Sequence, residues 1–299
     1  MSHPKTLMAG LALVFLVQLS GAAWAQSGAD YSAAVNSSGR ELFSRGQYRA
    51  AYEALQIRIQ AGDAEAVFYA LIIRRNGLDG RAPANRTETA ALWKLLHSQT
   101  GPMTQALSDS LVPTEVKDAY RTALAQLEYF GETPPPWPPL LHDPDRAKKI
   151  GSATRHIGGF TSRFGPARNF LAFLRLTTAG EKPKEVFKLM ETGAETGDAL
   201  AMGNLAFLFR NGIGTEKNNI RAAHWARQGS GGTEPPVSRN LNEVGYCYEA
   251  GLGVTQDLDE AARWYERSAA QGHPAGRVNV QRLKQKSEAQ PALDNAILF

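Results

Sequence analysis

Apolar side chains recur at helical spacing along much of this 299-residue chain. Two such faces carry matching residue types: Met202, Leu205, Ala206 and Phe209, then Leu241, Val244, Gly245 and Tyr248, which follow 39 positions later (241 − 202 = 39). Apolar residues three and four positions apart lie on one side of an α-helix. Each stretch therefore predicts an amphipathic helix that packs one face against its neighbours.

The residues that follow these faces recur with the same period. Gly212-x-Gly214 returns as Gly251-x-Gly253, Ala222-Ala223 as Ala261-Ala262, and Trp225 as Trp264. Glycine can end a helix in the left-handed conformation without steric cost, and small alanine pairs let helices approach closely. We expect the two tryptophans to fill the space between hairpins. Self-similarity at this period predicts an all-α solenoid of stacked antiparallel helical hairpins.

The remaining elements follow from glycine breaks and capping residues. We expect helices or hairpins over 31–61 (broken at Gly46), 64–75, 86–96, 114–130, 167–196 (broken at Gly180), 197–231 and 238–271, and a terminal capping helix from Pro274. Asp63, Asn85, Asn218 and Asp257 are the expected N-caps, and Glu88 and Glu260 would complete capping boxes. The stretch near 62–96 is a divergent earlier copy. It has three inserted residues between Gly77 and Trp93, and Arg74 stands at the position of Phe209 and Tyr248.

A proline-rich segment, Thr133 to Pro139, gives the best domain boundary, because proline holds the chain extended. The chain then divides into a signal peptide (1–25), N-terminal hairpins (26–131), a Pro-rich linker with a basic segment (132–165), C-terminal repeats with a capping helix (166–286) and a tail (287–299). The stretch from Arg146 to Arg168 has six Lys or Arg and no acid. We interpret it as a solvated loop and a helix start rather than a phosphate- or lipid-binding stripe.

The N-terminus has the layout of a secretory signal. Lys5 precedes an apolar run over 7–19, and Ala23-Trp24-Ala25 forms a cleavage site before Gln26. The run is too short for a comfortable membrane span. We therefore expect export to the periplasm and no stable membrane insertion after the signal is cleaved.

Charge and reactive residues narrow the function classes. The net charge of +4 is too weak to indicate nucleic-acid binding. Cys247 is the only cysteine, and we expect it to be a buried small hydrophobe on a helix. The six histidines show no metal-ligand spacing, and no nucleophile motif is present. The sequence therefore predicts no catalytic residue, no cofactor and no metal site.

The run from Leu241 to Gly272 resembles the Sel-one-like repeat (SLR), a variant of the tetratricopeptide repeat, of the exported bacterial type. The resemblance rests on Gly245, Tyr248, Gly251, Gly253, Asp257, Ala261, Trp264 and Gly272. The copy at 197–229 is similar, with Ala206 for the usual glycine, and the copy near 62–96 is similar in part. The resemblance implies a superhelix with a concave surface that serves protein–protein scaffolding, and it implies no catalytic residue.

We therefore expect a periplasmic scaffold or regulatory adaptor that holds another protein, from the envelope, on the concave face of a solenoid. The candidate partner-binding residues are Arg210, Arg221, Arg227, Glu249 and Arg263. The alternative is a β-lactam-binding or hydrolysing enzyme, which the cysteine-rich relatives of the family suggest. Those relatives carry a pair of cysteines in each unit, whereas this chain has Cys247 alone.

Overall fold

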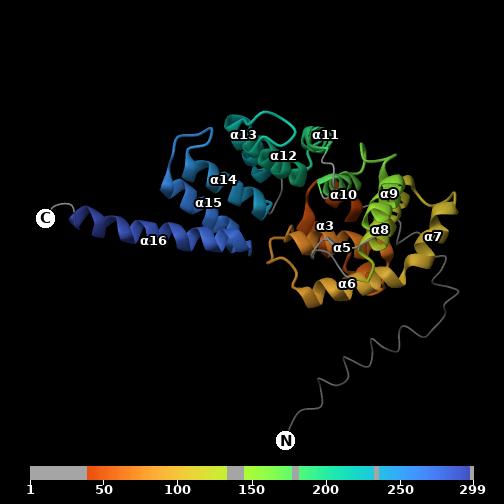
Figure 1. The fold of residues 1–299 in the computed structure, drawn as a ribbon. Helices are drawn as coiled ribbons and strands as arrows, with labels where there is room; N and C mark the ends of the chain where they lie inside the picture. The colour runs from red at the N-terminus through yellow and green to blue at the C-terminus, as the bar shows by residue number, and fades with distance from the viewer. Residues whose placement is uncertain (1–38, 133–144, 177–181, 232–235, 297–299) are drawn as a thin grey trace, which may run out of the picture.

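The computed structural model describes residues 39–132, 145–176, 182–231 and 236–296, with side chains as far as residue 286. Within these ranges the chain forms helices and turns and no strand, so the all-α prediction is confirmed (Figure 1). The signal peptide, the segment Thr133 to Pro139 and Gly180 lie outside the described residues.

The helices of the N-terminal part begin just after a short helical stretch at 39–44. They are α3 (Tyr48–Ala54), α4 (Gln56–Gln60), α5 (Ala64–Asn76), α6 (Arg86–Ser98), α7 (Thr100–Ser108) and α8 (Thr114–Phe130). The C-terminal part contains α9 (Arg146–Ile157), α10 (Gly165–Leu176), α11 (Pro183–Glu195), α12 (Ala199–Asn211), α13 (Asn219–Gly231), α14 (Ser238–Ala250), α15 (Leu258–Ala270) and α16 (Pro274–Ala296).

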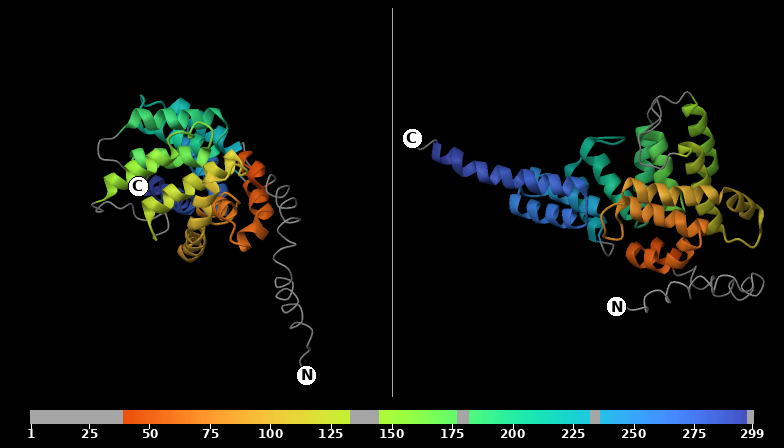
Figure 2. Two further views of the ribbon diagram at one scale, coloured as in Figure 1. Left: turned by 90° about the vertical axis from the view of Figure 1, so that its right-hand side faces the viewer. Right: turned by 90° about the horizontal axis from the view of Figure 1, so that it is seen from below.

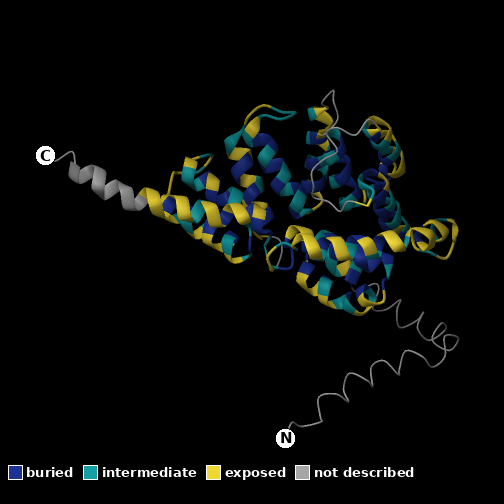
Figure 3. Cartoon of the chain, turned by 60° about the horizontal axis from the view of Figure 1, so that its bottom comes forward, coloured by how far each residue is buried: buried dark blue, intermediate teal, exposed yellow. Residues whose placement is uncertain are grey.

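Consecutive helices from α8 to α16 pack against one another as predicted for a solenoid. In Figure 1 they follow an arc, with α3, α5 and α6 on its inner side. The last helix, α16, packs along α15 and then extends away from the rest of the molecule (Figures 1 and 2). Buried side chains run through the interior of the whole stack, whereas the outward faces of the helices are exposed (Figure 3).

The two regular copies share one loop geometry. Gly212 and Gly251 follow α12 and α14 with φ of 68° and 64°, the left-handed conformation that favours glycine. The N-cap residue of the second helix then donates its backbone N–H to a carbonyl in the last turn of the first helix. Asn218 donates to the carbonyl of Phe209 at 2.8 Å, and Asp257 donates to that of Tyr248 at 3.0 Å. The loop therefore holds both helices of a hairpin together.

All four predicted N-caps are confirmed. The side chains of Asp63, Asn85, Asn218 and Asp257 each accept a hydrogen bond from the backbone N–H three residues on. The glutamates of the two expected capping boxes have other partners. Glu88 pairs with Arg74, and the carboxylate of Glu260 accepts from Trp264 and Arg263. The box motif therefore predicts where these helices begin but not where the glutamate points.

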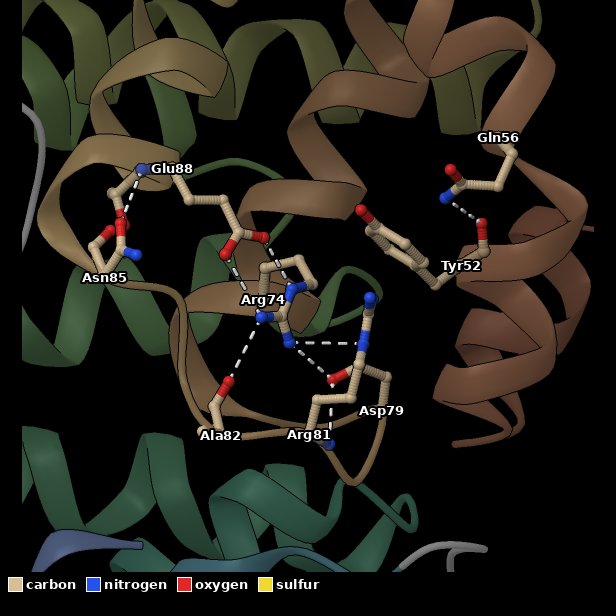
Figure 4. A network of polar contacts seen from close by, with 9 residues as sticks. Tyr52, Gln56, Arg74, Asp79, Arg81, Ala82, Asn85 and Glu88 are labelled. Carbon is tan, nitrogen blue, oxygen red and sulfur yellow. Dashed lines mark hydrogen bonds and ion pairs between the residues drawn. The ribbon is translucent and has the colours of Figure 1, made fainter. Parts of the chain in front are cut away.

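The divergent copy is a hairpin of α5 and α6, and Arg74 organises its longer loop (Figure 4). Its guanidinium binds Asp79 (Nη1 to Oδ1, 2.9 Å), Glu88 (Nε to Oε1, 2.7 Å) and the carbonyl of Ala82 (Nη2 to O, 3.1 Å). Arg74 and Asp79 are both buried, so the ion pair is shielded from water. The arginine that replaces the aromatic residue of the later copies thus fixes the inserted loop.

The basic segment forms helix α9 rather than a solvated loop, which corrects the sequence interpretation. Ile150, Ala153 and Ile157 are buried in one cluster with Tyr129 of α8 and Phe170 of α10. Residues 146–157 are therefore part of the stacked helices. The apolar positions are spaced three and four apart, but they are few, and small or polar residues such as Gly151, Ser152 and Thr154 lie between them, so the pattern is weak in the sequence.

The N-terminal helices also contact the C-terminal repeats directly. Tyr48 and Ala51 of α3 share a buried cluster with Ala199 at the start of α12 and Val237 just before α14. A second contact joins the α5–α6 loop to the end of α15, where a Cβ atom on Gly272 would lie 2.4 Å from the Cα of Ala82. These contacts between residues far apart in the sequence hold the N-terminal helices against the C-terminal repeats.

The tryptophans of the two regular repeats bury less than expected. Trp225 and Trp264 are partly buried at the edge of a cluster that includes Ala206 and Ala226. Tyr265, next to Trp264, is fully buried instead. Of the described tryptophans in the repeats, Trp93 of the divergent copy fills the core, and its indole N–H donates to the carbonyl of Gly131 at 3.0 Å.

Candidate functional site

The five predicted partner-binding residues divide into two groups in the structure. Arg221, Arg227 and Arg263 are exposed on the second helices of their hairpins, α13 and α15. Arg210 and Glu249 lie on the first helices, α12 and α14, and are partly buried in contacts within the chain. The structure therefore does not bring the five together into one surface.

Arg210 links two hairpins. Its guanidinium pairs with Glu243 of α14 (Nη2 to Oε2, 3.3 Å) and lies 4.5 Å from the ring centroid of Tyr246. Both side chains of the ion pair are largely shielded, at 19% and 12% exposure. An arginine that is engaged by a carboxylate and an aromatic face has little free surface to offer a partner. Its evident role is to fix α12 against α14.

Glu249 holds the terminal helix. Its carboxylate forms a bidentate pair with Arg282 of α16 at 2.5 Å and accepts the hydroxyl of Tyr265 at 2.8 Å. The hydrogen bond from Arg282 lowers the pKa of Glu249 despite the opposing effect of its partial burial, and the Tyr265 hydroxyl adds to the lowering. The carboxylate is therefore charged and already satisfied at neutral pH.

The remaining arginines differ in how far they are engaged. The guanidinium of Arg221 lies 5.4 Å from the ring centroid of Phe209, across its own hairpin. Arg263 is 65% exposed and pairs with Glu260 one turn earlier on α15. Arg227 has no carboxylate partner among the described residues. Of the predicted residues, Arg227 is therefore the one most available to a ligand.

Arg227 also lines an open groove of about 770 Å³ along α13. The wall on α13 is formed by residues at helical spacing, and the two ends are formed by the start of α12 and by the loop after α14. The lining residues are Gly197, Met202, Ile220, Ala223, His224, Arg227, Gln228, Gly231, Gly253 and Val254. The groove combines an exposed apolar side chain, Ile220, with Arg227, which has no carboxylate partner among the described residues.

Gly253 forms one end of this groove, and Gly214 is its equivalent in the preceding repeat. Gly253 lies so close to the start of α13 that a Cβ atom there would be 2.6 Å from the Cα of Ile220. Gly214 makes the corresponding approach to α11, with its virtual Cβ 2.0 Å from the carbonyl oxygen of Pro183. Both glycines have positive φ. The second glycine of each loop is therefore required because the loop packs directly on the backbone of the preceding hairpin.

Sequence reasoning missed Ile220, which is 72% exposed in the groove. The signal lies in the repeat itself. Ile220 aligns with Asp259 of the next copy (259 − 220 = 39), at a position that is exposed in both. An apolar residue at a solvent-exposed position where the neighbouring repeat has an acid is a candidate contact residue.

The described residues show neither a reactive cysteine nor a cluster of metal-ligand side chains. Cys247 is buried as predicted, and burial raises the pKa of its thiol to about 11, with a further rise from Glu243. The thiol is therefore protonated at neutral pH and poorly nucleophilic. No group of three His, Cys, Asp or Glu side chains within the described ranges could hold a metal ion. No helix in those ranges is both long and apolar enough to cross a bilayer.

Comparison with known proteins identifies the repeats. Residues 199–230 and 241–273 match the model of the Sel1 repeat. A stretch of 104 residues is 28% identical to the DAP3-binding cell death enhancer 1 of Rattus norvegicus, which covers 35% of this chain and 19% of the rat protein. The chain thus spans about a fifth of the length of the curated relative that it matches.

Several solved structures are similar over part of their length. A Sel1 repeat protein from Oxalobacter formigenes is 26% identical, covering 40% of this chain and 90% of its own, with a TM-score of 0.37. A protective antigen of uropathogenic Escherichia coli that displays an SLR fold is 18% identical, covering 84% and 57%, with a TM-score of 0.46. The cysteine-rich protein B of Helicobacter pylori is 15% identical, covering 45% and 96%, with a TM-score of 0.36.

Both matched segments coincide with hairpins of the structure: α12 with α13, and α14 with α15. Sel1 repeat proteins are in general interaction modules without catalytic activity, and such repeats typically mediate contacts between proteins. With its stacked helical hairpins, this chain is a helical-repeat protein that contains Sel1 repeats at residues 199–230 and 241–273.

Proposed function

We propose that this chain is a protein–protein interaction module of the bacterial envelope, exported through its N-terminal signal and acting as a scaffold or regulatory adaptor. The observation that carries the proposal is the open groove along α13. The groove exposes Ile220 and Arg227, whereas recurring residues of the same repeat, such as Gly214, Ala222 and Ala223, are used in packing between helices. A rigid surface with a free apolar side chain and a free cation suits the capture of another protein.

The expected partner site was the concave face of the solenoid. On the inner side of the arc, the start of α12 is covered by Tyr48 and Ala51 of α3 (Figure 1). This covered part of the arc is occupied by the chain itself. We therefore place the proposed partner surface at the groove along α13, which remains open.

The localisation is tested by fractionation and by sequencing the mature N-terminus. We expect the chain in the periplasmic fraction, starting at Gln26. A form that retains residues 1–25 and partitions with the cytoplasm would refute the export part of the proposal and leave the interaction part standing.

The interaction is tested by affinity purification from the native host with wild type and a variant in which Ile220→Asp and Arg227→Glu are combined. These substitutions install the residues that the next repeat carries at the same positions, Asp259 and Glu266. We expect a partner that wild type retains and this variant loses. Lys94→Glu, an exposed charge reversal on α6, is the matched control and should retain it. Equal capture by all three proteins would refute the groove as the partner site.

A further inference from the structure

The groove differs from the corresponding face of the next repeat in both charge and polarity. On α13 the exposed residues along the stripe are Ile220, His224 and Arg227. The equivalent residues of α15, 39 positions later, are Asp259, Arg263 and Glu266. Exposed positions in the same hairpin fold thus carry an isoleucine, a histidine and an arginine in one copy, and two acids with an arginine between them in the other. Packing does not require either set, so the difference points to a ligand.

Helix α13 itself carries no acid, and Glu216 in the loop before it does not line the groove. From Lys217 to Gly231 the chain has two arginines, a lysine and a histidine and no aspartate or glutamate. In contrast, Arg210 is paired with Glu243 and Arg263 with Glu260. None of the groove-lining residues that the structure describes is acidic. The charge complement of this groove is therefore a carboxylate supplied from outside.

The spacing along α13 sets the geometry of such a ligand. Ile220 and Arg227 are seven residues apart, which is about 10.5 Å along a helix axis. A peptide in the extended polyproline II conformation spans the same distance in about three residues, at roughly 3.1 Å each, and its three residues per turn place side chains three positions apart on the same side. An apolar side chain over Ile220 and Val254 and a carboxylate beside Arg227 would therefore come from positions three residues apart in an extended ligand.

We propose that the groove along α13 binds an acidic segment of a partner protein, in which an apolar residue and a carboxylate lie three positions apart in an extended chain. The apolar side chain packs on Ile220 and Val254 at one end of the groove. The carboxylate pairs with Arg227, and His224 lies between the two contacts. This inference rests on the proposed interaction function and adds the chemistry of the partner.

The test is selection from a random seven-residue peptide library displayed on phage, with the purified full chain as the target. Wild type is compared with the Ile220→Asp/Arg227→Glu variant. The control is the reciprocal change on α15, Asp259→Ile combined with Glu266→Arg. Circular dichroism and thermal melting check that all three are folded. We expect wild type and the α15 control to enrich peptides with an apolar and an acidic residue three apart, and the α13 variant to lose them.

A selected peptide then allows measurement of affinity by fluorescence polarisation. Replacing its carboxylate by the amide should weaken binding to wild type about three- to tenfold, and raising the salt concentration should weaken it further. The Arg227→Gln variant should bind the acidic and amide peptides equally. Equal affinity for the two peptides would show that Arg227, rather than the fold as a whole, recognises the carboxylate.

Three results would overturn the proposal. One is enrichment of basic or uncharged peptides, or of the same peptides by the α13 variant. Another is a dimer of wild type in light scattering that the α13 variant abolishes, which would assign the groove to a second copy of the chain. The third is sedimentation with phosphatidylglycerol vesicles that depends on Ile220 and Arg227. One of these results can occur while affinity purification still finds a native partner that the Ile220→Asp/Arg227→Glu variant loses. In that case the interaction function stands, and only the proposed acidic ligand is refuted.

Discussion

Gly245 of α14 lies directly against the ring of Tyr265 of α15: a Cβ atom on Gly245 would be 2.7 Å from Cδ1 of that ring. The preceding repeat has alanine at both corresponding positions, Ala206 and Ala226, which share one buried cluster. A glycine facing a tyrosine in one copy is thus replaced by two alanines in the other. The two helices of each hairpin therefore approach each other closely in both copies, but with different side chains at the contact.

This relationship predicts a non-additive pair of substitutions. Gly245→Val should lower the free energy of unfolding by about 1–3 kcal/mol because the added side chain meets the ring. Tyr265→Ala should lower it by about 3–5 kcal/mol because it empties a fully buried site. The double variant should lose less than the sum of the two, since the valine enters the space left by the ring. Guanidinium unfolding followed by circular dichroism measures all three. Strict additivity would show that the two residues are not coupled.

The tryptophans predict a contrast between repeats. Trp93 is 2% exposed, so Trp93→Ala should cost about 3–5 kcal/mol. Trp264 is only partly buried, with its indole N–H on Glu260 and Arg267 stacked on its ring. Trp264→Ala should therefore cost about 1–3 kcal/mol. The same unfolding experiment compares them, and a larger loss for Trp264 would contradict the burial seen here.

The Glu249–Arg282 pair predicts part of the acid sensitivity. The pKa of Glu249 is lowered in the folded chain, chiefly by the hydrogen bond from Arg282. A lowered folded pKa stabilises the fold above the unfolded pKa of a glutamate, about 4.3, and the contribution is lost as the pH falls through the folded value.

Glu249→Gln should therefore flatten the loss of stability between pH 6 and pH 3 relative to wild type. Thermal melts across this range provide the measurement, with Glu53→Gln on the exposed face of α3 as the matched control. Identical slopes for wild type and Glu249→Gln would show that the pair does not titrate with folding.

The loop of the divergent copy predicts a strong effect at Arg74. Arg74→Met should lower the free energy of unfolding by about 3–5 kcal/mol, because Asp79 is then left buried with only the exposed Arg81 as a partner. Asp79→Asn in the same chain should recover part of the loss by removing the buried charge. If the double variant is no more stable than Arg74→Met alone, the ion pair is not the reason for the arginine.

The contact between α3 and the start of α12 predicts a local opening. Ala51 is fully buried with Ala199 and Val237, so Ala51→Glu should place an unpaired charge in this contact and separate the two surfaces. Hydrogen exchange should then increase at α3 and at the start of α12, while α15 stays protected. Glu53→Gln is again the matched control. Faster exchange throughout the chain would indicate general unfolding instead.

Most of the helices could be predicted from glycine breaks, caps and apolar spacing, because these are local signals. Asp63, Asn85, Asn218 and Asp257 begin their helices as predicted. The sequence did not predict the helix of the basic segment, because its few apolar residues form a buried face only when α8 and α10 pack against them. Tertiary contacts of this kind leave little trace in a single sequence.

The candidate site was predictable only in part. Arg227 was selected as an exposed charge and does line the groove, whereas Arg210 and Glu249 turned out to have partners on other helices. Each partner, Glu243 for Arg210 and Arg282 for Glu249, is 33 residues distant (243 − 210 = 33 and 282 − 249 = 33), so the sequence did not reveal the pairing. Ile220 could have been found by aligning the two repeats and asking which exposed positions change character.

The junction of Tyr48 and Ala51 with Ala199 and Val237 has a consequence for how this chain can vary in evolution. An open array of repeats tolerates gain or loss of a unit at any place, since each unit touches only its neighbours. Here an extra hairpin inserted between α5 and α12 would carry the two sides of the junction apart. Duplication should therefore be confined to the stretch beyond α14, and homologues should differ in length there rather than in the middle.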